Sequence, residues 1–296
     1  MKKSYVSICM HRISDEYSPA YPPIPVKVFE RYIKFLKRKY GFTSINDLQD
    51  RRASKGSILL TFDDAYYDFY ENAFPILQKN GVPAVLSVIT SCADTGKSFW
   101  TQELNKIIEM FYKENRQNEL SRLSFLKNHP LAFNNVERTA LETYKILLPI
   151  KEKESALMEL KTLLGKQVDF TKMMTWKEIK EVQNAGISIA SHTVNHLNLT
   201  TLANEELKCE LKQSKAKIED ELNTKISAIA YPNGEFNKNV LDLSKKAGYN
   251  FAFSVENKSF QISDNEFQII PRVLVYHQKF WKLRIQFAWL VCFQLK

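Results

Sequence analysis

The stretch Ile58–Tyr67, ILLTFDDAYY, places two adjacent carboxylates directly after a run of apolar and β-branched residues. This pattern predicts a buried strand over Ile58–Phe62 that ends at an edge where polar side chains gather. Neighbouring residues at a strand end point in different directions, so Asp63 and Asp64 can perform two different tasks, for example as a base and as a metal ligand. An Asp-Asp pair by itself more often forms a turn or a helix cap, so a second signal is needed.

A second stretch, Ile187–Leu199 (ISIASHTVNHLNL), shows a similar pattern, in which a short apolar strand is followed by His192 and His196. One Asp and two His form a ligand set that leaves coordination positions open for water and substrate. A lone His-x-x-x-His is often a surface feature. Here three of the chain's histidines, His11, His192 and His196, directly follow short apolar runs. We therefore interpret the arrangement as a metal site.

Three motifs together resemble those of the polysaccharide deacetylases of the NodB-homology type, the fourth family of carbohydrate esterases. They occur in the family's order and at similar separations, and they are Thr61-Phe62-Asp63-Asp64, Ser191-His192-Thr193-Val194-Asn195-His196 and Ala230-Tyr231-Pro232-Asn233-Gly234. The likeness covers residues 4–90 and 175–276. It implies a distorted (β/α) barrel of about seven parallel strands, with the active residues at the strand ends on one face. The alternation of strand and helix patterns also favours a parallel α/β fold.

The resemblance further implies the roles of the motif residues. Asp64, His192 and His196 are expected to bind a divalent metal, with Zn²⁺ as the first choice and Co²⁺, Ni²⁺ or Mn²⁺ as alternatives. Asp63 is expected to be the base that takes a proton from water. The backbone N–H of Tyr231 is expected to help hold the developing oxyanion.

The proton donor has two candidates. His11 follows the first predicted strand, Tyr5–Met10, and resembles the general acid of a family sub-group that opens with a strand and a histidine. His277, in the sequence VLVYHQK, resembles the late histidine that other members use. Imidazole titrates near neutral pH, so either histidine could give a proton to a leaving amine. We favour His11 because it ends the first strand, as the sub-group's pattern requires.

The sequence departs from the family pattern at two positions. Ala65 stands where the family usually has Gly, which adds a methyl group after the paired aspartates. Most members also have an arginine shortly before the third motif, where it orients the catalytic aspartate, and Ser227–Ala230 contains none. Arg272, on the late predicted strand Gln268–Tyr276, is the candidate substitute. The alternative for Arg272 is a surface ion pair.

We expect residues 1–296 to form a single polysaccharide deacetylase domain. A segment at about 91–170 has dense Leu, Ile, Lys and Glu at helical spacing and resembles the family least, which predicts a helical insertion. The tail at about 279–296 mixes Phe, Trp and Leu with Lys and Arg, which suits a helix at a membrane interface or a last helix on the core. Its longest run without charge, Ile285–Leu295, falls short of the ~20 residues that span a bilayer.

The composition bears on partners and location. The formal net charge of +9 favours an anionic partner, such as phosphate-bearing lipid, acidic glycan, membrane or nucleic acid, or else only solubility. No recognition motif supports nucleic acid, so we predict no nucleic-acid partner. The N-terminal MKKSYVSICMHRIS reads as a strand rather than a signal peptide. Scattered cysteines favour reduced thiols in a cytoplasmic protein, and they are Cys9, Cys92, Cys209 and Cys292.

The predicted function is the metal-dependent removal of an N-acetyl group from an amino sugar of a polysaccharide or glycan precursor, in cell-surface polysaccharide biosynthesis. A cytoplasmic, basic protein with an apolar and basic tail favours a lipid-linked or nucleotide-linked precursor and peripheral contact at the inner membrane face. One alternative is a catalytically inactive glycan-binding protein of the same fold, suggested by Ala65 and the missing arginine. Another is a deacylase of a non-sugar amide or an O-acetyl ester.

Overall fold

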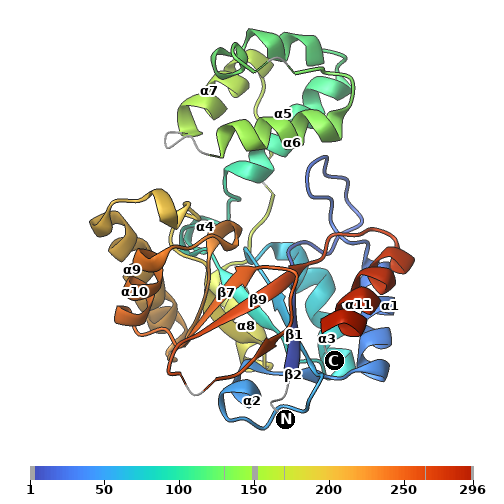
Figure 1. Cartoon of the computed structure of the whole chain (residues 1–296). Coiled ribbons are helices and arrows are strands. Elements are labelled where there is room, and N and C mark those ends of the chain that lie inside the picture. The colour runs from blue at the N-terminus through green and yellow to red at the C-terminus, as the bar shows by residue number, and fades with distance from the viewer. Residues whose placement is uncertain (1–3, 130, 149–152, 170, 264, 295–296) are drawn as a thin grey trace. The chain divides into compact units, whose positions relative to one another are not determined.

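The computed structural model describes residues 4–129, 131–148, 153–169, 171–263 and 265–294. It divides into two compact units. Unit 1 consists of Met1–Asp15, Ile24–Gly96 and Met173–Lys296, and unit 2 of Glu16–Pro23 and Lys97–Lys172 (Figure 1). The ends of the predicted domain, residues 1–3 and 295–296, and part of the predicted insertion, residues 130, 149–152 and 170, lie outside the described residues. That both units form one functional domain stays a prediction.

Unit 1 contains a closed barrel of parallel strands (Figure 1). In their order around the ring, the strands are β3 (Ile58–Phe62), β4 (Val85–Val88), β5 (Ser188–Ser191), β6 (Ala228–Ala230), β7 (Phe251–Val255), β9 (Gln268–Leu274) and β1 (Ser4–Met10). Parallel pairing of β1 with both β9 and β3 closes the ring. Two short strands extend it, with β2 (Phe42–Thr43) parallel to β3 and β8 (Phe260–Gln261) antiparallel to β1. The predicted barrel is confirmed.

The burial of strand β3 explains why its sequence is almost wholly apolar. All five of its side chains are fully buried, as expected for a barrel strand that faces the interior on one side and helices on the other. Ile58, Leu60 and Phe62 pack into the larger core with the surrounding helices, whereas Leu59 belongs to a separate core with residues of the other strands. Thr61 shares the orientation of Leu59, because side chains alternate along a strand. The next residue on that side is Asp63.

Helices connect the strands and cover the barrel. In unit 1 they are α1 (Val26–Lys39), α2 (Ile45–Gln49), α3 (Phe74–Asn80), α4 (Thr90–Thr95), α8 (Trp176–Asn184), α9 (Asn204–Leu222), α10 (Lys238–Lys246) and α11 (Phe280–Gln294). Thr175 and Glu178 form a capping box at the start of α8. None of the helices in the described part of the chain has the length and hydropathy that a membrane-spanning segment needs.

Two helical stretches are not single α-helices. The stretch that leads into α3 begins with a π-helical segment, Phe69–Ala73, and continues as α3. Pro75 lies in the first turn of α3, and because proline lacks an N–H it cannot continue a regular α-helical ladder from the preceding turn. The run Val136–Leu164 contains two helices, α6 (Val136–Leu147) and α7 (Lys153–Leu164).

Unit 2 is helical and has its own apolar core. Besides α6 and α7 it contains α5 (Trp100–Lys113) and two 3-10 segments, Gln117–Arg122 and Ser124–Leu126. Side chains from all three α-helices are buried together, among them Leu104, Phe111, Leu147 and Leu160. Because these residues bury one another, the segment predicted as an insertion is held together by its own hydrophobic contacts.

Gly234, in the third motif, has a backbone that only glycine fits well. Its φ is +73°, and a Cβ placed there would lie 2.4 Å from the Val255 nitrogen and 2.6 Å from the Val255 Cβ. We expect Gly234→Ala to lower the free energy of unfolding by about 2–5 kcal/mol, from the left-handed backbone and the forced overlap. Urea unfolding measures the loss.

Gly56 supplies the matched control for this substitution. Its φ is +77°, and an added Cβ would meet nothing within 4 Å. Gly56→Ala should therefore cost only the backbone term, about 1–2 kcal/mol. Equal losses in the two variants would show that the contact with Val255 does not constrain Gly234.

Candidate active site

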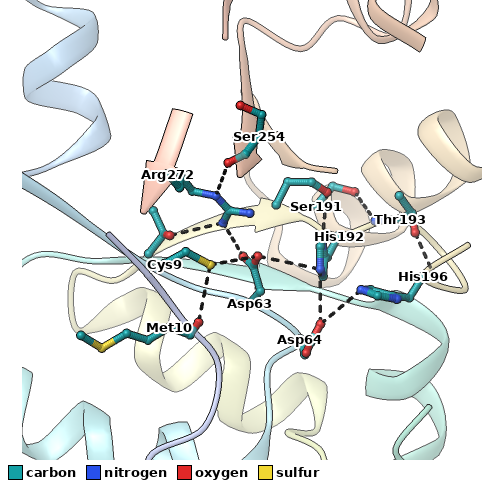
Figure 2. Close-up of polar contacts among 12 residues, drawn as sticks. Cys9, Met10, Asp63, Asp64, Ser191, His192, Thr193, His196, Ser254 and Arg272 are labelled. Carbon is teal, nitrogen blue, oxygen red and sulfur yellow. Dashed lines mark hydrogen bonds and ion pairs between the residues drawn. The ribbon is translucent and has the colours of Figure 1, made fainter. Parts of the chain in front are cut away.

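The predicted site residues gather at the carboxyl end of the barrel strands (Figure 2). Asp63 and Asp64 follow β3, and His192 follows β5. The Asp63 N–H donates to the Met10 carbonyl oxygen at 3.0 Å, which continues the ladder between β3 and β1. The exposed fractions of Asp63, Asp64 and His192 are only 2–3%. The barrel therefore brings both aspartates and the first histidine into one buried cluster.

Asp64, His192 and His196 form a group that could hold a metal ion. Their potential ligand atoms all lie within 4.8 Å of one another. The Asp64 Oδ1 atom is 3.3 Å from His192 Nε2 and 3.7 Å from His196 Nε2. Figure 2 shows both imidazole rings directed toward the Asp64 carboxylate. Two imidazoles and one carboxylate are a common ligand set for divalent transition metals.

Hydrogen bonds fix the His192 ring. Its Nδ1 lies 2.8 Å from the Ala230 carbonyl oxygen. A carbonyl oxygen can only accept, so Nδ1 carries a proton, and Nε2 is the ring nitrogen that faces Asp64. Metal-binding histidines are commonly oriented in this way by a carbonyl oxygen on the other ring nitrogen.

Glu210 on α9 holds the loop that carries His196. Its Oε2 accepts from the backbone N–H groups of Val194 and Asn195 at 2.8 and 3.0 Å. Its Oε1 accepts from the Asn195 side chain at 2.8 Å. The His196 N–H donates to Thr193 Oγ1 at 3.0 Å. Glu210 is a supporting residue that sequence reasoning missed, since nothing in the helical pattern of α9 marks a glutamate that faces inward.

Left-handed backbone conformations gather in the two motif loops. The φ angles are +75° at Asp64, +58° at Ala65, +69° at Thr193 and +54° at His196. Such conformations cost non-glycine residues of the order of 1–3 kcal/mol each, and they often mark functional sites. The value at Ala65 explains why glycine suits this position, and the alanine methyl group is accommodated in the buried core.

The Asp64 carboxylate fits a bound cation. Its Oδ1 is buried and accepts no hydrogen bond from the described residues, which is costly for an oxygen without a partner. Burial raises the pKa of Asp64, but His192, His11 and His196 outweigh it and the net pKa is lowered. Burial and the neighbouring His192 lower the pKa of His196 to about 4. An ionised carboxylate and a neutral imidazole are the forms that bind metal.

Arg272 of β9 pairs with Asp63. Its Nη1 lies 2.7 Å from Asp63 Oδ1, and neither side chain is more than 3% exposed. Nη1 also donates to Thr61 Oγ1 at 3.3 Å, and Nε donates to the Ser254 carbonyl oxygen at 3.2 Å. The alternative of a surface ion pair is therefore wrong. The predicted contact of Arg272 with Asp63 is present, although β9 is far from β3 along the chain.

The surroundings of Asp63 keep it ionised. Burial raises its pKa, but the Arg272 guanidinium and His192 outweigh this effect and hold the pKa well below the usual range. The second oxygen, Oδ2, accepts a hydrogen bond from Cys9 Sγ at 3.3 Å. Burial raises the pKa of the Cys9 thiol well above its usual value, so the thiol stays a donor. Sequence reasoning missed Cys9, although it lies on β1 two residues before His11, a spacing that places side chains on the same side of an extended chain.

The two candidate proton donors lie in different surroundings. His11 is half-buried, and its nearest ring nitrogen lies within 4.8 Å of both the Asp63 carboxylate and Cys9 Sγ. His277 follows β9, and its ring lies beside Tyr276 with centroids 5.0 Å apart. Within the described residues, His277 belongs to neither of the clusters that could bind metal. The geometry therefore favours His11.

The backbone N–H of Tyr231, which was expected to help hold the oxyanion, makes a hydrogen bond within the barrel. Its backbone N–H donates to the Phe253 carbonyl oxygen at 3.1 Å, as part of the pairing between β6 and β7. Its hydroxyl donates to Ser244 Oγ at 3.0 Å, and the side chain is fully buried. An oxyanion could reach this N–H only if the barrel hydrogen bond broke. Tyr231 therefore supports the third motif structurally.

The fold and the site define a parallel (β/α) barrel with a potential metal centre at the carboxyl end of its strands. The family model for polysaccharide deacetylases matches residues 50–252. The chain belongs to the polysaccharide deacetylase family.

Curated relatives agree with this assignment, and a solved structure agrees with the fold. A putative polysaccharide deacetylase, YxkH, of Bacillus subtilis (strain 168) is 22% identical over 240 residues, which are 79% of this chain and 59% of that protein. The poly-beta-1,6-N-acetyl-D-glucosamine N-deacetylase of Escherichia coli (strain K12) is 24% identical over 292 residues, covering 92% of this chain and 36% of that protein. The chain thus spans 59% and 36% of these two relatives. The structure of IcaB from Ammonifex degensii matches the fold with a TM-score of 0.64 at 16% identity, covering 96% of this chain and 97% of that one.

Proposed function

We propose that the protein hydrolyses the N-acetyl group of an amino sugar in a polysaccharide or glycan precursor, as a step of cell-surface polysaccharide biosynthesis. The observation that carries this proposal is the position of an ionised Asp63, paired with Arg272, beside the group of Asp64, His192 and His196. The names of the relatives support the substrate class, since the Escherichia coli protein is named for the deacetylation of poly-beta-1,6-N-acetyl-D-glucosamine.

Asp64, His192 and His196 would hold the divalent cation. Two imidazoles and one carboxylate favour Zn²⁺, with Co²⁺, Ni²⁺ and Mn²⁺ as alternatives. When bound, the cation supplies Lewis-acid chemistry to the acetyl carbonyl and to water. Asp64 Oδ1, which accepts no hydrogen bond from the described residues, and His192 Nε2, which faces it, fit such an ion.

Asp63 and His11 would carry the protons. Arg272 donates a hydrogen bond to Asp63 Oδ1, which holds the carboxylate in one orientation. Oδ2 would therefore be the oxygen that takes the proton of the attacking water. The water oxygen bonds to the carbonyl carbon, and the bond from this carbon to nitrogen then breaks. Protonated His11 gives its proton to the departing nitrogen, which leaves as a free amine with acetate as the other product. Exchange with solvent returns Asp63 and His11 to their starting forms.

Acetate release tests the proposal directly. Metal-loaded protein would be incubated with N-acetylated oligosaccharides, nucleotide-linked sugars and lipid-linked sugars, with and without a chelator. We expect release from at least one class that a chelator abolishes and added metal restores. Release only from a non-sugar amide or an O-acetyl ester would indicate the deacylase alternative. Glycan binding without any release would indicate the inactive binding protein.

We further propose that the outer face of α11 contacts an anionic membrane surface. The inner face packs on α1 through buried Leu283 and Phe287 (Figure 1). On the outer face Trp281 and Ile285, one helical turn apart, are 56% and 60% exposed. Lys282, which follows Trp281 in the chain, is also exposed. An apolar and basic surface of this kind suits the interface of an anionic bilayer. Co-sedimentation with phosphatidylglycerol vesicles but not phosphatidylcholine vesicles is expected, and equal or absent binding would refute it. The cytoplasmic location stays a prediction.

A further inference from the structure

A second cluster of potential ligands lies next to the Asp64 group. The ligand atoms of Cys9, His11 and Asp63 all lie within 4.8 Å of one another. Cys9 Sγ is 3.3 Å from Asp63 Oδ2. Figure 2 shows the Cys9 sulfur on one side of Asp63 and His192 on the other. The two clusters therefore meet at adjacent aspartates and share no side chain.

We propose that Cys9, His11 and Asp63 form a second cation site that takes thiophilic ions such as Zn²⁺ and Cd²⁺. One sulfur, one imidazole nitrogen and one carboxylate oxygen are ligands that such ions accept, whereas Mg²⁺ and Mn²⁺ prefer oxygen ligands. On binding, the Cys9 S–H bond breaks, a sulfur–metal bond forms and the proton leaves to solvent. No oxidation or reduction is involved.

The charges around this cluster determine the order of filling. Arg272 Nη1 donates a hydrogen bond to Asp63 Oδ1 at 2.7 Å. Oδ2 is therefore the oxygen that faces Cys9 and the incoming ion. The positive charge of Arg272 and the proton on the Cys9 thiol both oppose a cation. By contrast, Asp64 Oδ1 is buried and accepts no hydrogen bond from the described residues. The Asp64 group therefore fills first, and the Cys9 cluster fills only at higher free metal.

Occupation of the second site would inhibit the reaction. This consequence rests on the proposed function, in which Asp63 accepts a proton and His11 donates one. A cation bound to both residues removes the lone pair of the base and the proton of the acid. Excess Zn²⁺ is therefore an inhibitor, although Zn²⁺ in the Asp64 group supports activity.

Cadmium titration tests the site independently of activity. Metal-free protein that carries Cys209→Ser and Cys292→Ser would be titrated with Cd²⁺, while cadmium–thiolate absorption in the ultraviolet is recorded. We expect two Cd²⁺ ions per chain, with the thiolate band growing only with the second. In Cys9→Ser the band and the second ion are lost, and the first ion remains, which also shows that the variant is folded.

Cys92→Ser is the matched control, because Cys92 is also a buried free thiol. It should keep both ions and the band. A single ion without a thiolate band in the parent, or a band that survives Cys9→Ser, would overturn the proposed site.

The inhibition is measured separately. Excess Zn²⁺ should suppress acetate release. The inhibition constant for Zn²⁺ should rise at least 10-fold in Cys9→Ser, which corresponds to a loss of about 1.4 kcal/mol in binding free energy when the sulfur ligand is replaced. Full activity with the second site occupied would overturn the inhibitory role. Absence of acetate release in all conditions would refute the proposed function, while the cadmium titration would still decide the site.

Discussion

Asp63→Asn is expected to lower kcat for acetate release by about 10²–10⁴-fold while the first ion, in the Asp64 group, stays bound at one equivalent of metal. The amide keeps the shape of the carboxylate and can still accept a hydrogen bond from Arg272, but it cannot take a proton from water. Asp63 is also not among the three residues of the Asp64 group. Steady-state kinetics and elemental analysis of the same sample give both quantities.

Asp64→Asn is the matched comparison for this variant. It removes one of the three proposed ligands, so both the metal and the activity should be lost. Full turnover in Asp63→Asn would refute its role as the base. Loss of this first ion in Asp63→Asn would instead show that Asp63 is a ligand of the Asp64 group and that the two aspartates have been assigned in the wrong order.

Arg272→Met is expected to lower the free energy of unfolding by about 3–5 kcal/mol at neutral pH, because it leaves the buried Asp63 carboxylate without its partner. The Arg272 Nη1 to Asp63 Oδ1 contact is 2.7 Å, and neither residue is more than 3% exposed. Urea unfolding of the metal-free protein measures the loss without interference from bound metal.

The loss should depend on pH with a definite sign. In the parent the pKa of Asp63 is lowered, so its contribution to stability is complete above the unfolded value of about 3.9 and disappears as the pH falls through the folded value. Without Arg272, burial dominates and the pKa of Asp63 rises. The variant's penalty should therefore shrink as the pH is lowered, and the acidic limb of its pH–rate profile should move to higher pH.

The double variant Asp63→Asn with Arg272→Met separates the charge from the packing. It removes both charges, so no carboxylate is left buried without a partner, and it should recover much of the stability that Arg272→Met loses. If the double variant were as unstable as the single variant, the loss would come from the missing contacts of Arg272 with Thr61 and Ser254 rather than from Asp63.

The elements of the barrel were predictable because they depend on short-range patterns. A run such as Ile58–Phe62 is apolar at every position, which marks a strand buried on both faces. The capping box at Thr175 and Glu178 likewise marks the start of α8 within four residues. The π-helical segment Phe69–Ala73 was not predicted, because the hydrophobic spacing before Pro75 is the same for an α-helix and a π-helix over so short a stretch.

The strands, most of the helices and the proximity of Asp64, His192 and His196 could be predicted from the sequence. Strand ends in a parallel barrel meet on one face, so polar residues at such ends converge whatever the exact order of the strands. Local pattern and chemistry were sufficient for these predictions.

The contacts of Asp63 depend on the tertiary structure, although the sequence already offered Arg272 as a candidate partner. Arg272 is 209 residues away in the chain, and its contact exists because β9 and β3 both pair with β1. The same pairing brings Cys9 to Asp63 Oδ2. The Tyr231 N–H, which was expected to donate to the oxyanion, donates instead to the Phe253 carbonyl oxygen in the barrel. Each of these facts depends on strand register and on the competition for hydrogen bonds in a closed barrel, which no local pattern encodes.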